Sequence, residues 1–169
     1  LSDQWHLVAG VRQDEIDYER VDLARSNGQS AGLIDTDFSG TSWRLGAVFK
    51  PVDNTSIYAQ YSTAVDAIQS LLTATNPDLD LSEGEQFEVG IKQNLLDDQL
   101  QYTLSLYDIV KSDLISSAPG GVQRQIGEQS SRGIEFELFW LPVDVFSIDF
   151  NLALTAPEYE TFVSGGDDY

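Results

Sequence analysis

The chain lacks several residue types, and each absence removes a class of function. Its 169 residues include no cysteine, which excludes disulfides, zinc–thiolate sites and cysteine nucleophiles. His6 is the only histidine, so a metal site built on several histidines has no second ligand of that type. Methionine is also absent and the chain opens within a strand pattern, so we expect it to be part of a longer protein.

Basic side chains are scarce. The sequence has 9 Lys and Arg against 28 Asp and Glu, which gives a formal net charge of −19 at pH 7. A nucleic-acid partner would require a basic face to meet its phosphates, so this class of function is disfavoured. The same balance argues against a peripheral helix that docks on anionic lipid through Lys and Arg. Acidic side chains instead suit a water-filled lumen or solvated loops.

Long hydrophobic runs are missing as well, so a membrane-spanning structure would have to be built from strands rather than helices. Alternation of apolar and polar residues is present, most clearly over residues 133–141 and 146–154. Successive side chains of a strand point to opposite faces, so Ile134, Phe136 and Leu138 share one face, opposite Glu135 and Glu137. A long apolar face opposite a charged one is typical of a barrel in lipid with a polar lumen.

The alternation predicts seven strands, at residues 5–24, 37–50, 55–64, 85–94, 99–115, 122–141 and 146–162. Three connections are tight turns with Pro or Asp, at residues 51–54, 95–98 and 142–145. The other three are longer, at residues 26–36, 65–82 and 116–121, and we expect a short helical turn at 66–72. Short turns on one rim and long loops on the other are typical of outer-membrane barrels, whose short turns are periplasmic.

Aromatic residues support the same architecture independently of loop length. Five of them lie on the apolar side within a few residues of the short-turn rim: Trp5, Phe49, Tyr102, Trp140 and Phe146. Membrane barrels carry girdles of aromatic residues at their interfaces. We therefore expect an aromatic girdle at the periplasmic interface.

Several short segments resemble the TonB-dependent siderophore receptors. The segment at residues 43–62, Trp-Arg-Leu-Gly-Ala-Val-Phe-Lys-Pro-Val-Asp-Asn followed by Ser-Ile-Tyr-Ala-Gln-Tyr-Ser, is similar to a hairpin of that family's barrel. Residues 84–92 and 104–109 are similar to the two strands that follow, and residues 127–135 to a segment late in the barrel. These signatures occur in the family's order and together cover nearly the whole chain.

The resemblance implies an all-β fold, an antiparallel up-and-down transmembrane β-barrel segment of about seven strands from a 22-stranded barrel. Residues 1–169 would be a partial barrel domain, without the N-terminal plug, the TonB box and the C-terminal strands. The implied location is the bacterial outer membrane, and the implied partners are membrane lipid, a ferric siderophore or similar metal chelate, and TonB through the missing plug. No cofactor and no nucleic acid are implied.

Ligand contacts are expected from lumen-facing residues high on the strands. Gln60, Tyr107, Arg124 and Gln125 are the candidates, although ordinary lumen surface explains each of them better. Glu135 and Glu137 lie two residues apart, as a glycosidase pair could, but a polar barrel interior requires such carboxylates in any case.

Arg132 falls on the apolar side of its strand, where a lipid-facing arginine is costly near the bilayer midplane. We expect it at or above the outer interface; the alternative is a bulge at Gly127 or Gly133 that reverses the alternation. Two other functions stay open, a passive porin-like channel and a soluble carbohydrate-binding β-sandwich. No constellation of residues supports an enzyme.

Overall fold

The computed structural model describes residues 4–22, 32–67, 79–118, 122–143, 145–161, 163–164 and 167–168, and all of its regular structure is strand. Seven long strands follow one another in chain order: β1 Trp5–Asp22, β2 Gly32–Val52, β3 Thr55–Asp66, β4 Ser82–Leu95, β5 Leu100–Ala118, β6 Val122–Val143 and β7 Phe146–Thr161. Two dipeptide strands follow, β8 Val163–Ser164 and β9 Asp167–Asp168.

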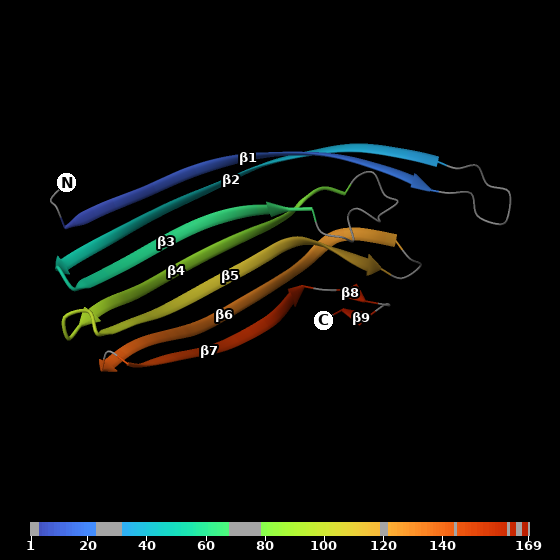
Figure 1. Ribbon diagram of the computed structural model, residues 1–169. Coiled ribbons are helices and arrows are strands. Elements are labelled where there is room, and N and C mark those ends of the chain that lie inside the picture. Colours follow the sequence, from blue (N-terminus) through green and yellow to red (C-terminus); the bar gives the residue numbers. More distant parts are fainter. Residues whose placement is uncertain are drawn as a thin grey trace.

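Each long strand pairs antiparallel with the next one in sequence, giving the order β1-β2-β3-β4-β5-β6-β7. Figure 1 shows these strands side by side in one curved sheet, with the short connections at one end and the long ones at the other. The predicted meander is therefore confirmed. The expected long connection between β5 and β6 is shorter than predicted, because β5 continues to Ala118 and only residues 119–121 separate it from β6. Among the described residues, none belongs to a helix long and apolar enough to cross a membrane.

The tight turns fix the register of the hairpins. Val52 pairs with Thr55 across a two-residue turn, and Leu95 pairs with Leu100 across a four-residue turn. In the second turn Leu96, Asp97 and Asp98 all have φ between 52° and 67°. This left-handed conformation is costly for leucine and better tolerated by aspartate.

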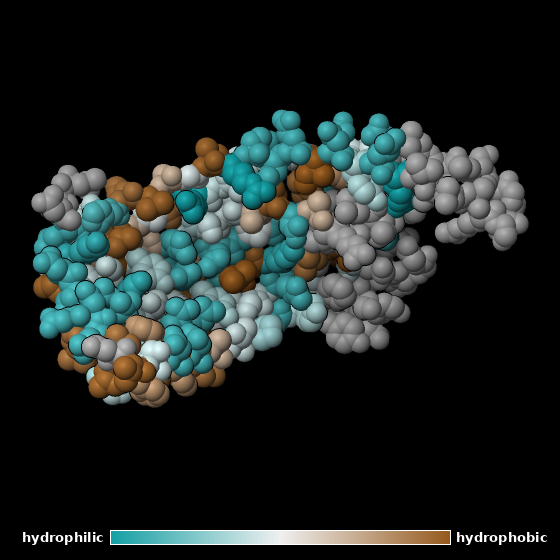
Figure 2. All heavy atoms as spheres, in the orientation of Figure 1, coloured by the Kyte–Doolittle hydropathy of each residue, from teal (hydrophilic) through white to brown (hydrophobic). Residues whose placement is uncertain are grey.

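The sheet has one apolar and one polar face over the half that adjoins the short turns. Residues directly opposite each other on paired strands share a face, so Leu7, Ala47, Ile57 and Ile91 belong to one continuous apolar surface. The side chains of this surface are exposed in the isolated chain, for example Leu7 at 63%. Figure 2 shows hydrophilic residues over much of the opposite face, with hydrophobic ones along the rim of the short turns.

The expected aromatic residues do lie at this rim and on the apolar face. Trp5 pairs with Phe49, and their rings stack with centroids 4.7 Å apart. Trp140 pairs with Leu100, the first residue after the turn between β4 and β5. No second layer of protein covers the apolar face over the described strands, since all seven belong to one sheet.

Toward the long connections the two faces exchange character. On β1 the positions that carry Leu7 and Val11 lower down carry Glu15 and Asp17 higher up, while Ile16 takes the opposite face. The ladder between β1 and β2 runs from Trp5 to Asp22 without a bulge, so the strand itself does not change face. The exchange of apolar and polar faces therefore comes from what surrounds the sheet at this height, and not from a change in the backbone.

A small hydrophobic core occupies this upper end. Phe38, Leu79 and Leu81 are its buried members, and the partly buried residues against it are Ile16, Tyr18, Val65, Ala67 and Ile115. Gly40 allows the close packing, because an added Cβ would lie only 2.7 Å from Cγ2 of Val65. The upper β1–β2 hairpin thus packs against the end of β3 and the segment that precedes β4.

Several predicted boundaries were too short at this end. Residues 32–36 belong to β2 and not to a loop, β3 continues to Asp66, β4 begins at Ser82, and β5 extends to Ala118. The reason is that a β-ladder needs only paired backbone groups, whereas the prediction required an apolar face that these segments lack. Most of the helical turn expected at 66–72 lies outside the described residues, and its first residue, Asp66, belongs to β3.

Arg132 keeps the apolar alternation of β6, as expected. The register from Arg132 through Trp140 is uninterrupted on both sides, so Gly133 carries no bulge. In the ladder with β5 the irregularities lie higher, where Leu114 pairs with Gly127. In the ladder with β7 they lie on both sides of this stretch, at Glu128–Gln129 and at Trp140–Val143. Arg132 Nε donates a hydrogen bond to Asp108 Oδ2 at 2.9 Å, and Asp108 in turn pairs with Phe87 of β4.

Candidate functional site

A hydrogen-bonded carboxylate lies at the centre of the polar face. Glu88 on β4 accepts hydrogen bonds from the Tyr58 hydroxyl at 2.7 Å and from the amides of Gln60 and Gln86, each at 3.0 Å. Three neutral donors from two strands therefore fix the Glu88 side chain. None of these donors is a cation, so they orient the Glu88 carboxylate without neutralising its negative charge.

Two tyrosines lie flat against the polar face, each over a glycine of the neighbouring strand. Tyr58 covers Gly90, and Tyr107 covers Gly133; a Cβ added to either glycine would overlap the tyrosine ring. The Tyr107 hydroxyl continues to β7, where it shares a hydrogen bond of 2.9 Å with Thr155 Oγ1. Glycine is thus required at both positions for the rings to lie in this orientation.

The candidates Gln60 and Tyr107 come close together. Both are direct cross-strand neighbours of Glu88, one on each side, so the three share a face in the middle of the sheet. Gln60 is part-buried and engaged with Glu88. Tyr107 is held by Thr155.

The other two candidates lie at the upper end of β6, apart from this pair. Arg124 pairs with Ser116 and its side chain is exposed. The amide of Gln125 donates to the carbonyl oxygens of Asp80 at 2.6 Å and Asp113 at 3.1 Å, and it accepts from the Asp80 N–H at 2.8 Å. Gln125 therefore fastens the segment before β4 to the β5–β6 hairpin.

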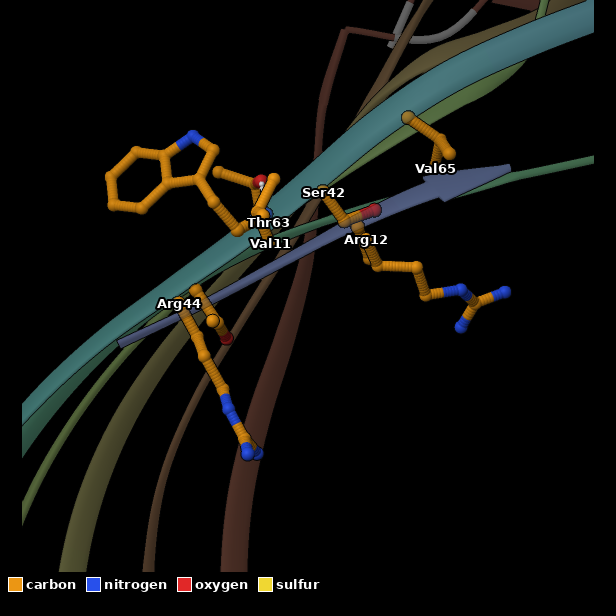
Figure 3. Close-up of a pocket in the computed structure, with 10 residues that line it drawn as sticks. Val11, Arg12, Ser42, Arg44, Thr63 and Val65 are labelled. Carbon is orange, nitrogen blue, oxygen red and sulfur yellow. Dashed lines mark hydrogen bonds between the residues drawn. The ribbon is translucent and has the colours of Figure 1, made fainter. Parts of the chain in front are cut away.

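A hollow of about 370 Å³ opens where β2 and β3 separate. The ladder between them ends at Arg44 and Ser62, and above it Thr63 Oγ1 accepts a hydrogen bond from the Trp43 N–H at 3.1 Å. Arg12 of β1 and Arg44 of β2 line the hollow, and Figure 3 shows both side chains on the same side of the sheet. The cross-strand pairing places that side on the polar face.

Neither arginine was among the sequence candidates, and neither was Glu88. The alternation in the sequence does place all three on the polar face, because Leu45 and Val89 of the same strands lie on the other face. The sequence did not reveal that β2 and β3 part at this height, and this separation creates the hollow. Within the described ranges, no three His, Asp or Glu side chains are grouped so that they could hold a metal ion.

Comparisons with known proteins agree with the geometry. The family described as "TonB dependent receptor-like, beta-barrel" matches residues 1–169. The probable TonB-dependent siderophore receptor PiuA of Acinetobacter baumannii is 26% identical over 148 residues, which cover 82% of this chain and 20% of that protein. The ferrichrome receptor FcuA of Yersinia enterocolitica is 29% identical, with coverages of 85% and 19%. The chain thus spans about a fifth of the length of these relatives.

Solved structures show the same fold. The crystal structure of the siderophore receptor PiuA from Acinetobacter baumannii superimposes with a TM-score of 0.84 at 24% identity, covering 98% of this chain and 25% of that one. For the copper transporter OprC the TM-score is 0.67 at 17% identity, with coverages of 95% and 28%. The apolar face is then the lipid-facing side of a barrel wall, and the polar face lines its lumen. The chain belongs to the TonB-dependent receptor family, as a seven-strand stretch of its outer-membrane β-barrel.

Proposed function

We propose that this stretch of barrel is part of a receptor that imports ferric siderophores or similar metal chelates across the outer membrane. The observation that carries the proposal is the family match over residues 1–169, together with relatives whose names include siderophore and ferrichrome receptors. Residues 1–169 form part of the barrel domain, and the plug and the remaining strands belong to the rest of the protein. Energy comes from TonB through the plug.

Transport by such a receptor requires binding and conformational change, with no covalent chemistry. The chelate binds at the extracellular mouth, the plug rearranges, and the ligand passes along the polar face. Gln60, Tyr107, Arg124 and Gln125 are proposed contacts of the chelate. For Gln125 such a contact requires that its hydrogen bonds to Asp80 and Asp113 open first.

Uptake of radioactive iron tests this function. A strain lacking the full-length gene and a strain carrying it are compared for accumulation of ⁵⁵Fe from a panel of chelates, with and without a functional TonB. We expect at least one chelate to enter only when both the receptor and TonB are present. Entry that persists without TonB would indicate a passive porin, and no difference between the strains would refute import.

The soluble carbohydrate-binding sandwich finds no support in the fold. Such a protein would enclose Leu104, Phe136 and Phe150 between two layers, whereas Leu104 is 40% and Phe150 48% exposed on a single sheet. These side chains require a hydrocarbon environment instead.

A further inference from the structure

We propose that the hollow between β2 and β3 binds phosphatidylethanolamine, a lipid whose head group carries an ammonium, at the extracellular edge of the bilayer. This inference goes beyond chelate import and depends only on the position of the barrel wall in the outer membrane. The hollow has a volume of about 370 Å³ and opens where the ladder between the two strands ends, at Arg44 and Ser62.

On the lipid-facing side the hollow has an apolar wall. The side chains that border it there include Val11, Trp43 and Thr63. Val11 pairs with Trp43, and both follow the alternation that places Leu45 in lipid, so they share its face. The Trp43 ring packs on the ring of Tyr61, with centroids 5.1 Å apart. An acyl chain can lie against this wall without exposing apolar surface to water.

The hollow lies near the outer limit of the lipid-covered zone. A membrane strand needs ~9–11 residues, so a span that begins at Trp5 on the rim of the short turns ends near residues 13–15. Directly above Val11, the Thr41 hydroxyl donates a hydrogen bond of 2.6 Å to Gln13 Oε1 across the ladder. The hollow is therefore apolar below and polar above, as a lipid is where its chains meet its head group.

One carboxylate adjoins the hollow on the same side. Glu85 of β4 is the direct cross-strand neighbour of Thr63, and its side chain is exposed. The Tyr61 hydroxyl donates a hydrogen bond to this carboxylate, which orients it beside the hollow. A carboxylate can accept several hydrogen bonds, and a primary ammonium has three N–H donors to offer. Glu85 is thus placed to bind the ammonium of the head group.

Cations are missing from this part of the lipid-facing side. Among the described residues of β1 to β4, no Lys or Arg holds an outward position level with Val11 or above it. The outward cation on β6, Arg132, lies three strands from β3 and is paired with Asp108. An anionic head group would therefore meet Glu85 without a counter-charge, whereas an ammonium would be attracted to it.

The two arginines that line the hollow do not change this balance, because they lie on the lumen side. Arg12 Nε donates to Oδ1 of Asp14 at 2.7 Å. The stem of Arg44 lies across Gly10, where an added Cβ would come within 3.3 Å of Nε. Figure 3 shows Val65 on the other side of the strands from these two arginine side chains.

Lipid binding to the purified full-length receptor tests the proposal, with no chelate present. The receptor is stripped of lipid in a non-ionic detergent, and native mass spectrometry gives dissociation constants for phosphatidylethanolamine, phosphatidylglycerol and lipid A. Glu85→Gln removes the charge beside the hollow, and Glu19→Gln makes the same change far above it on the outward side of β1. Thr63→Phe fills the hollow, and Ile57→Phe is its control, lower on the same face of β3.

We expect the wild type to bind phosphatidylethanolamine about 10-fold more tightly than phosphatidylglycerol or lipid A. Glu85→Gln should weaken binding of phosphatidylethanolamine by roughly 5- to 20-fold, as for loss of a charged hydrogen bond, and should not weaken phosphatidylglycerol. Thr63→Phe should weaken phosphatidylethanolamine by about 10-fold, because the acyl chain loses its place. Glu19→Gln and Ile57→Phe should bind like the wild type.

The proposal is overturned if the wild type binds phosphatidylglycerol or lipid A as tightly as phosphatidylethanolamine. It is also overturned if Glu85→Gln keeps the preference for phosphatidylethanolamine, or if a folded Thr63→Phe variant binds this lipid like the wild type. Near-ultraviolet circular dichroism checks folding, and Glu85→Gln decides alone if Thr63→Phe does not fold. Uptake of ⁵⁵Fe is measured separately, so failure of lipid binding leaves the import function intact.

Discussion

The lower and upper halves of the sheet use the same strands in opposite ways. Beside the short turns, Leu7 and Leu45 face outward, more than half exposed, because lipid replaces water around them. Near the long connections, Phe38 faces inward and is only 9% exposed, and Glu15 and Asp17 take the outward positions. One uninterrupted ladder connects the two halves, so the surrounding solvent, and not the backbone, decides which face is apolar.

An arginine placed on the outward face should reveal the largest difference in stability between the two halves. Leu104→Arg puts a charge among Ile91 and Phe136 in the lower half, and we expect a cost of about 2–4 kcal/mol. Ser39→Arg makes the matched change on the outward face of the upper half and should cost about 0–1 kcal/mol. Denaturant unfolding of the full-length receptor in lipid vesicles measures both. Equal costs would mean that the upper half is also in hydrocarbon.

Truncating the core of the upper half should have the next largest effect. Phe38→Ala removes a buried ring from the cluster with Leu79 and Leu81, and about 3 kcal/mol of local stability should be lost. Ser39→Ala, the next residue on the outward face, should stay within about 0.5 kcal/mol of the wild type. Hydrogen exchange at residues 14–20 and 35–41 reports the change. Unaltered exchange in Phe38→Ala would show that the cluster does not hold the hairpin.

The glycines of the lumen wall allow a test within the polar face. Gly133→Ala would force the Tyr107 ring away from β6, at a cost of about 1–3 kcal/mol. Gly46→Ala is the control, because its added Cβ would meet nothing closer than 3.5 Å, and it should change stability by less than about 0.5 kcal/mol. The unfolding midpoint of the full-length receptor distinguishes them. Indistinguishable midpoints would contradict the close contact.

The smallest expected effect is a stabilisation at the short turns. Leu96 has φ 55°, which asparagine tolerates better than leucine, so Leu96→Asn should stabilise the receptor by about 1 kcal/mol. Asp53→Asn in the two-residue turn is the control, because Asp53 is not among the described non-glycine residues with positive φ. Its stability should not change. A loss of stability in Leu96→Asn would show that the exposed leucine side chain makes a compensating contact with the membrane.

The sequence revealed most of the lower half and little of the upper half. Leu104, Phe136 and Phe150 gave a regular alternation because lipid demands an apolar residue at every outward position. Above the membrane no such demand exists, so residues 32–36 looked like loop although they pair with β1. On β1 the apolar residues change face between Val11 and Ile16, within one uninterrupted ladder.

The residues of the candidate site also differ in how far the sequence indicated them. Tyr107 and Gln60 were chosen as candidates because polar positions of a clean alternation face the lumen. Arg12, Arg44 and Glu88 stood in the same alternation, but their importance depends on contacts between strands: Gly10 beneath Arg44, three donors around Glu88, and the parting of β2 from β3. Apart from the hydrogen bond from Gln86 to Glu88, these contacts join residues that are far apart in sequence.

The sequence by itself determined the strands, their order, the lipid-facing surface and the family, because alternation and short turns act locally along the chain. Only the tertiary structure decided where the ladders separate, which glycines lie beneath Tyr107 and Arg44, and how the upper hairpin encloses Phe38. These features arise from the register between strands, and register depends on how whole neighbouring strands pack against each other.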